Sequence, residues 1–316
     1  MKLWNARTVL SILLMTAISP FALGQSVMQQ DTAQSPLSIA LAAASDLSGR
    51  YRVTPDITYA LPNGYAVKLD VYKRSGPGMK ATLVYIHGGG WRGGQTKEEY
   101  SLWFEPFLFL GWNVVNVEYR PSTVASAPAA VEDCLCALRW VVHNAGRYDF
   151  DTNRIVVMGH SAGGHLALMT GMAPESLESN HECPGSEPLK VAAIVDWFGI
   201  TDVADLLQGA DARTFAQKWI GPARGRQARA KRMSPLTYVR PGLPPTIIIH
   251  GDKDPKVPYS QAVRLHNALT ASGVPNEFIT ISGGGHGGFG AGPTRRAYAQ
   301  VFEFLKKNGI GVKVAQ

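Results

Sequence analysis

The stretch Ile155-Val156-Val157-Met158-Gly159-His160-Ser161-Ala162-Gly163 decides the fold of this chain. An apolar, β-branched run ends in a serine with a glycine two positions to each side, and a stretch of small, helix-forming residues follows. This order predicts a buried strand, a sharp turn and a helix, with Ser161 at the apex of the turn. The glycines let the backbone bend tightly, so the hydroxyl projects and Ser161 is a candidate nucleophile. The five residues 159–163 alone fit a serine-capped, glycine-rich helix start equally well.

Two later segments supply the partners that a serine nucleophile needs. A histidine must take the serine proton, and a carboxylate must orient the imidazole and stabilise its charge. The apolar run 246–250 leads to Asp254, which we expect to be the acid, and the run 278–281 leads to His286 in a glycine-rich loop, which we expect to be the base. On a doubly wound sheet this order places all three side chains on loops at the carboxyl ends of strands. The alternatives are an exposed turn aspartate and a flexible glycine loop.

A fourth segment, Leu83-Val84-Tyr85-Ile86 followed by His87-Gly88-Gly89-Gly90-Trp91, predicts a strand that runs into a loop with unobstructed amide groups. Acyl transfer needs N–H donors aimed at the oxyanion that forms on the carbonyl oxygen. We expect the amides of Gly89, Gly90 and Ala162 to supply them. A plain strand-to-helix turn is the alternative, although it accounts poorly for three glycines in a row after a histidine.

Two tryptophans lie at the ends of these motifs, at the expected mouth of the pocket. We expect Trp91 and Trp197 to form aromatic walls for a small acyl group or a sugar ring. Their alternative role is ordinary core packing.

Together, these motifs resemble the α/β-hydrolase esterases of the hormone-sensitive-lipase-like branch, and they are most similar to secreted bacterial carbohydrate acetyl and feruloyl esterases. The similarity runs from about Tyr51 to the C-terminus. It implies an α/β fold with about eight mostly parallel strands, helices on both faces, no cofactor, and ester hydrolysis through an acyl-enzyme. It also implies a structural salt bridge between Arg120 and Asp133 beneath the site. A long N-terminal helical cap often covers the site in this branch, and the short polar stretch here argues against large lipid substrates.

The expected substrates are short-chain carboxylic esters, in particular acetyl or feruloyl esters of plant polysaccharides. A serine peptidase of the prolyl-oligopeptidase type shares the triad order, but it would normally need a second domain to admit peptides. A non-catalytic binding protein with the hydrolase fold is another alternative, although it would be expected to lack Ser161 or His286. A formamide-cleaving enzyme is a further alternative.

The composition fits one catalytic domain. The chain has 316 residues, of which 45% are hydrophobic and 17% charged, and this is ample for one large core. Its formal net charge of +7 is mild, so it favours solubility or loose attraction to acidic polymers and does not indicate nucleic-acid binding. The basic run 224–232 predicts a solvated helix face, with binding of acidic polysaccharide substituents as the alternative. No metal site is expected, because no histidine or cysteine pair has ligand spacing with companions.

The first 24 residues are typical of a secretory signal peptide. Lys2 and Arg7 form the positive start, residues 9–18 the apolar centre, and Ala22-Leu23-Gly24 the cleavage pattern. A membrane anchor is the alternative, but Pro20 ends an apolar stretch of about ten residues where a spanning helix needs about twenty. We therefore expect a periplasmic or secreted bacterial enzyme without membrane anchoring.

The rest of the chain is expected to comprise a polar linker over 25–50 and a catalytic domain over 51–316. Pro62-Asn63-Gly64 predicts an antiparallel hairpin at the sheet edge. Residues 200–234 interrupt the alternation of strands and helices, at the place where hydrolases of this fold insert a cap. We expect a small partial lid there, with plain surface helices as the alternative.

The three cysteines are an uneven number for an oxidising compartment. Cys134 and Cys136 lie two apart on a predicted helix over 126–145, so at most one of them can reach Cys183. One bridge with a buried free thiol and three unpaired core cysteines both stay open at this stage.

Overall fold

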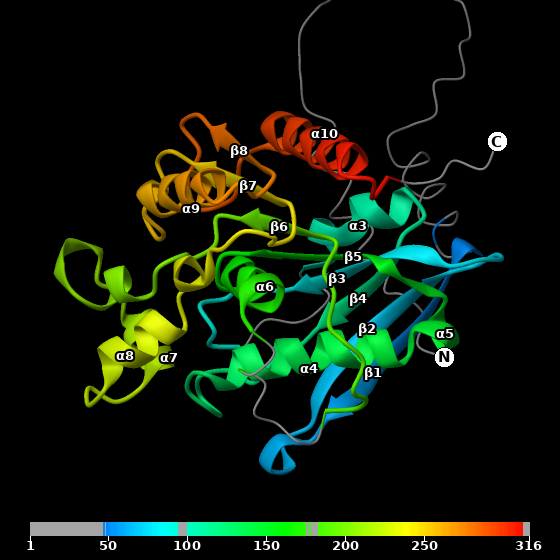
Figure 1. The fold of residues 1–316 in the computed structure, drawn as a ribbon, viewed down its shortest axis with the longest axis horizontal. Coiled ribbons are helices and arrows are strands. Elements are labelled where there is room, and N and C mark those ends of the chain that lie inside the picture. Colours follow the sequence, from blue (N-terminus) through cyan, green and yellow to red (C-terminus); the bar gives the residue numbers. More distant parts are fainter. Residues whose placement is uncertain (1–46, 48, 94–99, 175–176, 178–182, 312–316) are drawn as a thin grey trace, which may run out of the picture.

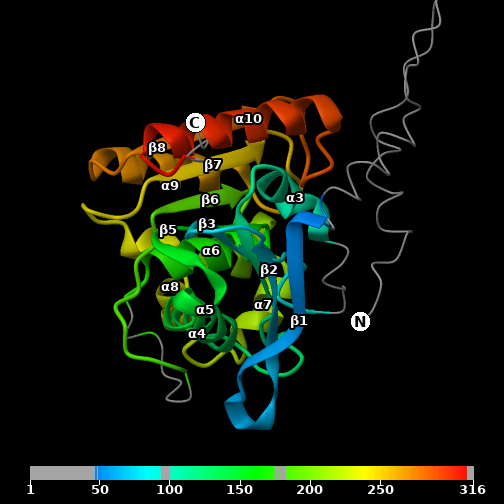
Figure 2. The same ribbon diagram turned by 90° about the vertical axis from the view of Figure 1, so that its right-hand side faces the viewer.

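The computed structural model describes residues 47, 49–93, 100–174, 177 and 183–311, so the expected signal peptide and nearly all of the expected linker lie outside the described residues. An eight-stranded sheet has the order β1-β2-β4-β3-β5-β6-β7-β8, and it twists strongly from one edge to the other (Figures 1 and 2). The strands are β1 Tyr51–Ala60, β2 Val67–Arg74, β3 Lys80–Ile86, β4 Asn113–Val117, β5 Phe150–His160, β6 Ala193–Trp197, β7 Thr246–Gly251 and β8 Asn276–Ile281. Pairing is antiparallel from β1 to β2 and from β2 to β4, and parallel between all later neighbours. The expected mostly parallel sheet and its edge hairpin are confirmed.

Helices cover both faces of the sheet, as expected (Figure 1). The helices are α3 Ser101–Phe109, α4 Ala129–His143, α5 Ala145–Tyr148, α6 Ala162–Met172, α7 Thr214–Ile220, α8 Arg226–Arg232, α9 Tyr259–Ala271 and α10 Ala291–Lys307. The apolar side chains of α3 and α10 join the core on one face, and those of α4, α6 and α9 join the core on the other.

Side chains that point alternately to the two faces of each central strand form these two cores. In β3, Val84 and Ile86 pack on the α4 and α6 side, whereas Leu83 and Tyr85 pack on the α3 and α10 side. All four side chains are fully buried. Successive side chains of a strand point to opposite faces, so a strand covered on both sides is apolar at every position. This is why the continuous apolar runs of the sequence are the central strands.

One predicted boundary differs from the structure. The helix expected over 126–145 begins later, at Ala129, because Pro128 precedes it as the N-cap residue, and it ends at His143.

A disulfide joins Cys136 to Cys183, with 5.3 Å between their Cα atoms, while Cys134 is buried and free. The alternative with one bridge and one buried thiol is therefore the one that the structure shows. The bond connects α4 to the segment that precedes β6.

The expected salt bridge between Arg120 and Asp133 is present. The Asp133 carboxylate accepts hydrogen bonds from the Arg120 main-chain N at 2.7 Å and from its Nε at 2.9 Å. Both residues are buried, and the Arg120 Nη2 also donates to the carbonyl of Ala129. A buried ion pair with this many hydrogen bonds fixes the segment after β4 to the start of α4.

The insertion over 200–234 contains α7 and α8, which lie beyond the carboxyl ends of the parallel strands (Figure 1). It is fixed to the rest of the molecule by Trp219 of α7, whose ring stacks on that of Trp91 with 4.1 Å between centroids. The Trp219 carbonyl also accepts a hydrogen bond from the Ala127 N–H. Within the described ranges, no helix has the length and apolarity that a membrane span requires.

Candidate active site

Ser161 lies in a sharp turn between β5 and α6, as the sequence predicts. Its backbone angles, φ 55° and ψ −122°, are unusual for a residue with a side chain. A Cβ on Gly159 would lie 2.2 Å from the Gly163 carbonyl oxygen, and one on Gly163 would lie 2.1 Å from the Ile86 oxygen. Only glycine fits at either position, because backbone atoms occupy the space. The two glycines therefore allow β5, β3 and α6 to approach closely enough to hold the strained serine.

The structure brings Ser161, His286 and Asp254 together in one hydrogen-bonded line. The Oγ of Ser161 lies 2.8 Å from the Nε2 of His286, and the Nδ1 of His286 lies 2.7 Å from the Oδ2 of Asp254. Because an ionised carboxylate only accepts, Nδ1 carries the proton and Nε2 is the acceptor for the serine hydroxyl. This is the tautomer that a general base needs.

Four hydrogen-bond donors surround the buried carboxylate of Asp254. The main-chain N–H groups of Lys256 and Val257 donate to Oδ1 at 2.7 and 3.0 Å. His286 donates to Oδ2, and the Nε2 of the fully buried His250 lies 3.3 Å from the same oxygen. Burial opposes ionisation, but the hydrogen bonds from His250, His286 and the Val257 N–H outweigh it and hold the pKa of Asp254 well below its ordinary value. The carboxylate is therefore charged wherever the imidazole can act as a base.

A second histidine, His160, precedes the serine and lines the same cavity, but it cannot serve as a competing base. Burial, with the neighbouring His87 and His286, lowers the pKa of His160 to about 3. Burial also keeps the Tyr85 hydroxyl protonated by raising its pKa, and this hydroxyl is hydrogen-bonded to the Nδ1 of His160 at 2.9 Å. The His160 ring is therefore a neutral wall of the cavity.

The loop after β3 places Gly89 and Gly90 on the cavity that Ser161 and His286 also line. Gly89 and Gly90 have φ values of 108° and 62°, a backbone region that favours glycine. Ala162 is the first residue of α6, where helical N–H groups have no acceptor within the helix. The three residues expected to donate to the oxyanion thus lie next to the serine, two across the cavity and one on its own helix.

The cavity itself has a volume of about 770 Å³, and four large aromatic side chains form part of its walls. Tyr100 and Trp103 come from the segment around α3, Phe198 follows β6, and Phe215 comes from α7 of the insertion. The Phe198 ring also packs edge-on against the imidazole of His286, with 4.8 Å between centroids. These aromatic walls shape the space around the serine and keep the imidazole in place.

The expectation that Trp91 and Trp197 form these walls is wrong. Both are fully buried, and neither lines the cavity. Trp91 stacks on Trp219, and Trp197 packs against Trp103 and Tyr298. The alternative that they are core residues holds, because each side chain turns into the core while the residue after it faces the cavity.

That one-position offset also explains what sequence reasoning missed. Arg92 and Phe198, each directly after a misassigned tryptophan, line the cavity. The chain changes direction after a strand ends, and this change is the available signal that the next side chain faces the cavity. Trp103 carries no comparable signal, since it lies outside all four motifs.

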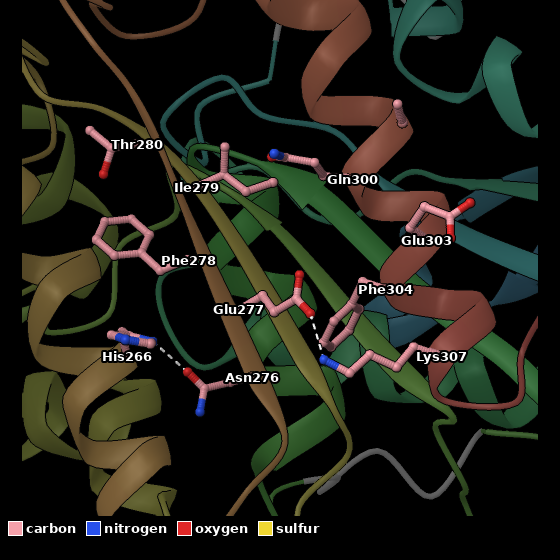
Figure 3. Close-up of a pocket in the computed structure, with 11 residues that line it drawn as sticks. His266, Asn276, Glu277, Phe278, Ile279, Thr280, Gln300, Glu303, Phe304 and Lys307 are labelled. Carbon is pink, nitrogen blue, oxygen red and sulfur yellow. Dashed lines mark hydrogen bonds and ion pairs between the residues drawn. The ribbon is translucent and has the colours of Figure 1, made fainter.

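A second cavity, of about 800 Å³, lies along the edge strand β8 between α9 and α10 (Figure 3). Polar side chains pair across it, with Lys307 donating to Glu277 and His266 bonded to Asn276. None of the three residues of the hydrogen-bonded line reaches this cavity. Its size is similar to that of the first cavity, so chemistry rather than volume identifies the candidate site.

Comparison with curated proteins finds esterases over most of this chain. Esterase LipQ of Mycobacterium tuberculosis is 30% identical over 229 residues, which cover 70% of this chain and 53% of LipQ. An acetyl esterase of Salmonella agona is 27% identical over 241 residues, covering 72% of this chain and 71% of that enzyme. The chain spans about half the length of LipQ and of its Mycobacterium relatives LipC and LipM.

Solved structures of esterases share the fold. A truncated carbohydrate esterase from gut microbiota superimposes with a TM-score of 0.70 at 28% identity, covering 82% of this chain and 97% of that one. Esterase Est2 of Thermogutta terrifontis gives 0.70 at 26% identity, covering 86% and 96%. The sequence profile of the BD-FAE family matches residues 69–269, more than half of the chain. The protein therefore belongs to the BD-FAE family, and its fold is that of the α/β-hydrolase esterases.

Proposed function

We propose that the protein hydrolyses short-chain carboxylic esters through an acyl-enzyme on Ser161. The observation that carries this proposal is the continuous hydrogen-bonded line from Asp254 through His286 to Ser161, which opens onto a cavity lined by Gly89 and Gly90. Nucleophile, base and orienting acid are each in the role that acyl transfer needs. The esterase names of the relatives support the same reaction class.

In the first half-reaction, the Nε2 of His286 removes the hydroxyl proton of Ser161 as Oγ attacks the ester carbonyl carbon. The imidazolium that forms is stabilised by the carboxylate of Asp254. The carbonyl oxygen becomes an oxyanion, for which the main-chain N–H groups of Gly89, Gly90 and Ala162 are the donors. The intermediate collapses, the C–O bond to the alcohol breaks, and the alcohol leaves with the proton from His286.

In the second half-reaction, a water molecule takes the place of the alcohol. His286 removes a proton from this water as its oxygen attacks the acyl carbon on Ser161. The same donors hold the second oxyanion, and the ester bond to Oγ breaks. Oγ regains a proton from His286, and the free acid leaves.

The proposed natural substrates are acetyl or feruloyl esters of plant polysaccharides. Aromatic walls suit the faces of sugar and phenolic rings, and the relatives include proteins named carbohydrate esterase and acetyl esterase. Residues 51–316 would form the catalytic domain, with 200–234 as a small fixed lid. Residues 1–24 would be a signal peptide that is removed on export, and sequencing the N-terminus of the native protein tests this.

The test of the function is a hydrolysis panel with acetylated xylan, methyl ferulate, aryl esters of increasing acyl length and a prolyl amide. The wild type is expected to cleave the short esters and not the amide. Ser161→Ala should keep the circular dichroism spectrum of the wild type and lose ester hydrolysis. Retained hydrolysis in that variant would reject Ser161 as the nucleophile, and cleavage of the amide alone would reject the esterase proposal.

A further inference from the structure

The cavity beside Ser161 carries two cationic side chains, Arg92 and Lys256, and no carboxylate among the lining residues that the structure describes. Within the described part of the chain, neither cation forms an ion pair. Elsewhere in the described part of the chain, other cationic side chains do form ion pairs, such as Arg154 with Asp151. Among the lining residues that the structure describes, the charges next to the proposed nucleophile are therefore positive.

Lys256 starts from a rigid stretch of backbone. Its N–H donates to the Oδ1 of Asp254 at 2.7 Å, and its carbonyl accepts from the Nε of Arg213 at 3.0 Å. The carbonyl of the preceding Pro255 accepts from Arg213 as well, at 3.1 Å. The ammonium is thus carried by a loop that the triad acid and a residue of the insertion fix from two sides.

Arg92 starts from an equally fixed position on the opposite wall. Its N–H donates to the carbonyl of Gly89 at 3.2 Å, and it follows the fully buried Trp91. Trp91 is in turn stacked on Trp219. The guanidinium therefore extends from the loop that also carries the proposed oxyanion donors.

The sheet order places these two cations on either side of the serine. Arg92 follows β3, Ser161 follows β5 and Lys256 follows β7, and the order in the sheet is β3-β5-β6-β7. The carboxyl ends of parallel strands meet at one edge, so a ligand at Ser161 lies between the two side chains. Aromatic walls reduce the water around the ligand, which strengthens its attraction to fixed charges.

We infer that the site selects esters that carry a carboxylate close to the scissile bond, such as an esterified acidic sugar. Arg92 and Lys256 bind the carboxylate by charge-assisted hydrogen bonds, and the aromatic walls pack on the rest of the substrate. This inference rests on the proposed ester hydrolysis. It defines the substrate class by charge, beyond the acyl groups considered above.

Two matched pairs of aryl esters test the inference and locate the carboxylate. On the alcohol side, 3-carboxy-4-nitrophenyl acetate is compared with 4-nitrophenyl acetate, with rates divided by those of hydroxide-catalysed hydrolysis. On the acyl side, the 4-nitrophenyl monoester of adipic acid is compared with 4-nitrophenyl hexanoate. The wild type is expected to prefer the charged member of at least one pair by about tenfold in kcat/KM at low salt, and the preference should shrink as salt screens the charges.

The variants Arg92→Gln and Lys256→Gln assign the preference to side chains. At least one is expected to lower the charged-to-neutral ratio of kcat/KM by about fivefold. Lys190→Gln is the matched control, because Lys190 is exposed and precedes β6 at the opposite edge of the sheet. It should leave the ratio unchanged.

The outcomes separate the two proposals. A wild type that hydrolyses both members of each pair equally, or favours the neutral esters, overturns the carboxylate inference and leaves ester hydrolysis intact. If neither Gln variant lowers the charged-to-neutral ratio of kcat/KM, the carboxylate inference is overturned as well. A protein that hydrolyses none of the four esters contradicts the proposed function itself.

Discussion

The Nε2 of His250 lies 3.3 Å from the Oδ2 of Asp254, the same oxygen that accepts the Nδ1–H of His286 at 2.7 Å. The Nε2 of His250 also lies 3.1 Å from the carbonyl oxygen of Val257. Both neighbours are acceptors, so this nitrogen carries a proton. His250 therefore positions the triad acid and stabilises its charge at the same oxygen that binds His286.

Replacing His250 by Phe is expected to lower kcat for 4-nitrophenyl acetate by about tenfold, with little change in KM. The loss of one donor raises the pKa of Asp254 and leaves its carboxylate less firmly held, so the imidazole of His286 is oriented less well. His250→Gln, which can still donate, should recover part of the rate. The control is His143→Gln at the exposed end of α4. A His250→Phe variant with the wild-type kcat, or one that His250→Gln does not improve on, would contradict this role.

Gly163→Ala is expected to destabilise the protein by about 2–4 kcal/mol and to abolish activity. The added Cβ would lie 2.1 Å from the carbonyl oxygen of Ile86, so β3 and α6 would have to move apart. Denaturant unfolding and ester hydrolysis measure the two effects. Gly146→Ala is the matched control, because nothing lies within 4 Å of its added Cβ. Equal stability of the two variants would show that the close approach in the turn is not required.

Glu105→Gln is expected to make the protein more stable at alkaline pH. Burial raises the pKa of Glu105 from its ordinary 4.5 to about 7. The folded state keeps a proton that the unfolded chain releases above pH 4.5, so the stabilising contribution of this group is lost as pH rises through about 7. The Gln side chain has no charge to bury, and at pH 8 the variant should be about 1–3 kcal/mol more stable than the wild type. The two curves should converge near pH 4.5, and a difference that is constant with pH would contradict the shift.

Thiol titration of the denatured, unreduced protein is expected to find one reactive group, Cys134. Breaking the Cys136–Cys183 bridge with Cys183→Ser should cost about 2–4 kcal/mol of stability, because the bond restrains a long loop in the unfolded chain. Three reactive thiols in the unreduced wild type would show that the bridge does not form.

The sequence alone predicts the mostly parallel sheet, its edge hairpin and the three residues of the hydrogen-bonded line. Short apolar runs such as 83–86, which are followed by glycine-rich turns, are typical of strands buried on both faces. The order Ser161, Asp254, His286 then follows from the rule that functional loops of a parallel sheet leave its carboxyl edge.

The cavity walls are harder to predict, since they depend on directions rather than on order. Whether Trp197 or Phe198 faces the serine depends on how the backbone turns after β6, where Phe198 adopts a φ of 42°. Trp103 reaches the site only because α3 packs against the sheet next to β3. Both are consequences of tertiary packing that no local pattern encodes.

The most direct measurement of the central claim is the site of covalent modification by diethyl 4-nitrophenyl phosphate, an organophosphate that reacts with activated serines. Peptide mass spectrometry of the inactivated protein should find one diethylphosphoryl group, on Ser161, and its formation should slow by about a thousandfold in His286→Ala. Modification of a different residue with the same loss of activity, or unchanged reactivity of Ser161 without His286, would contradict the account.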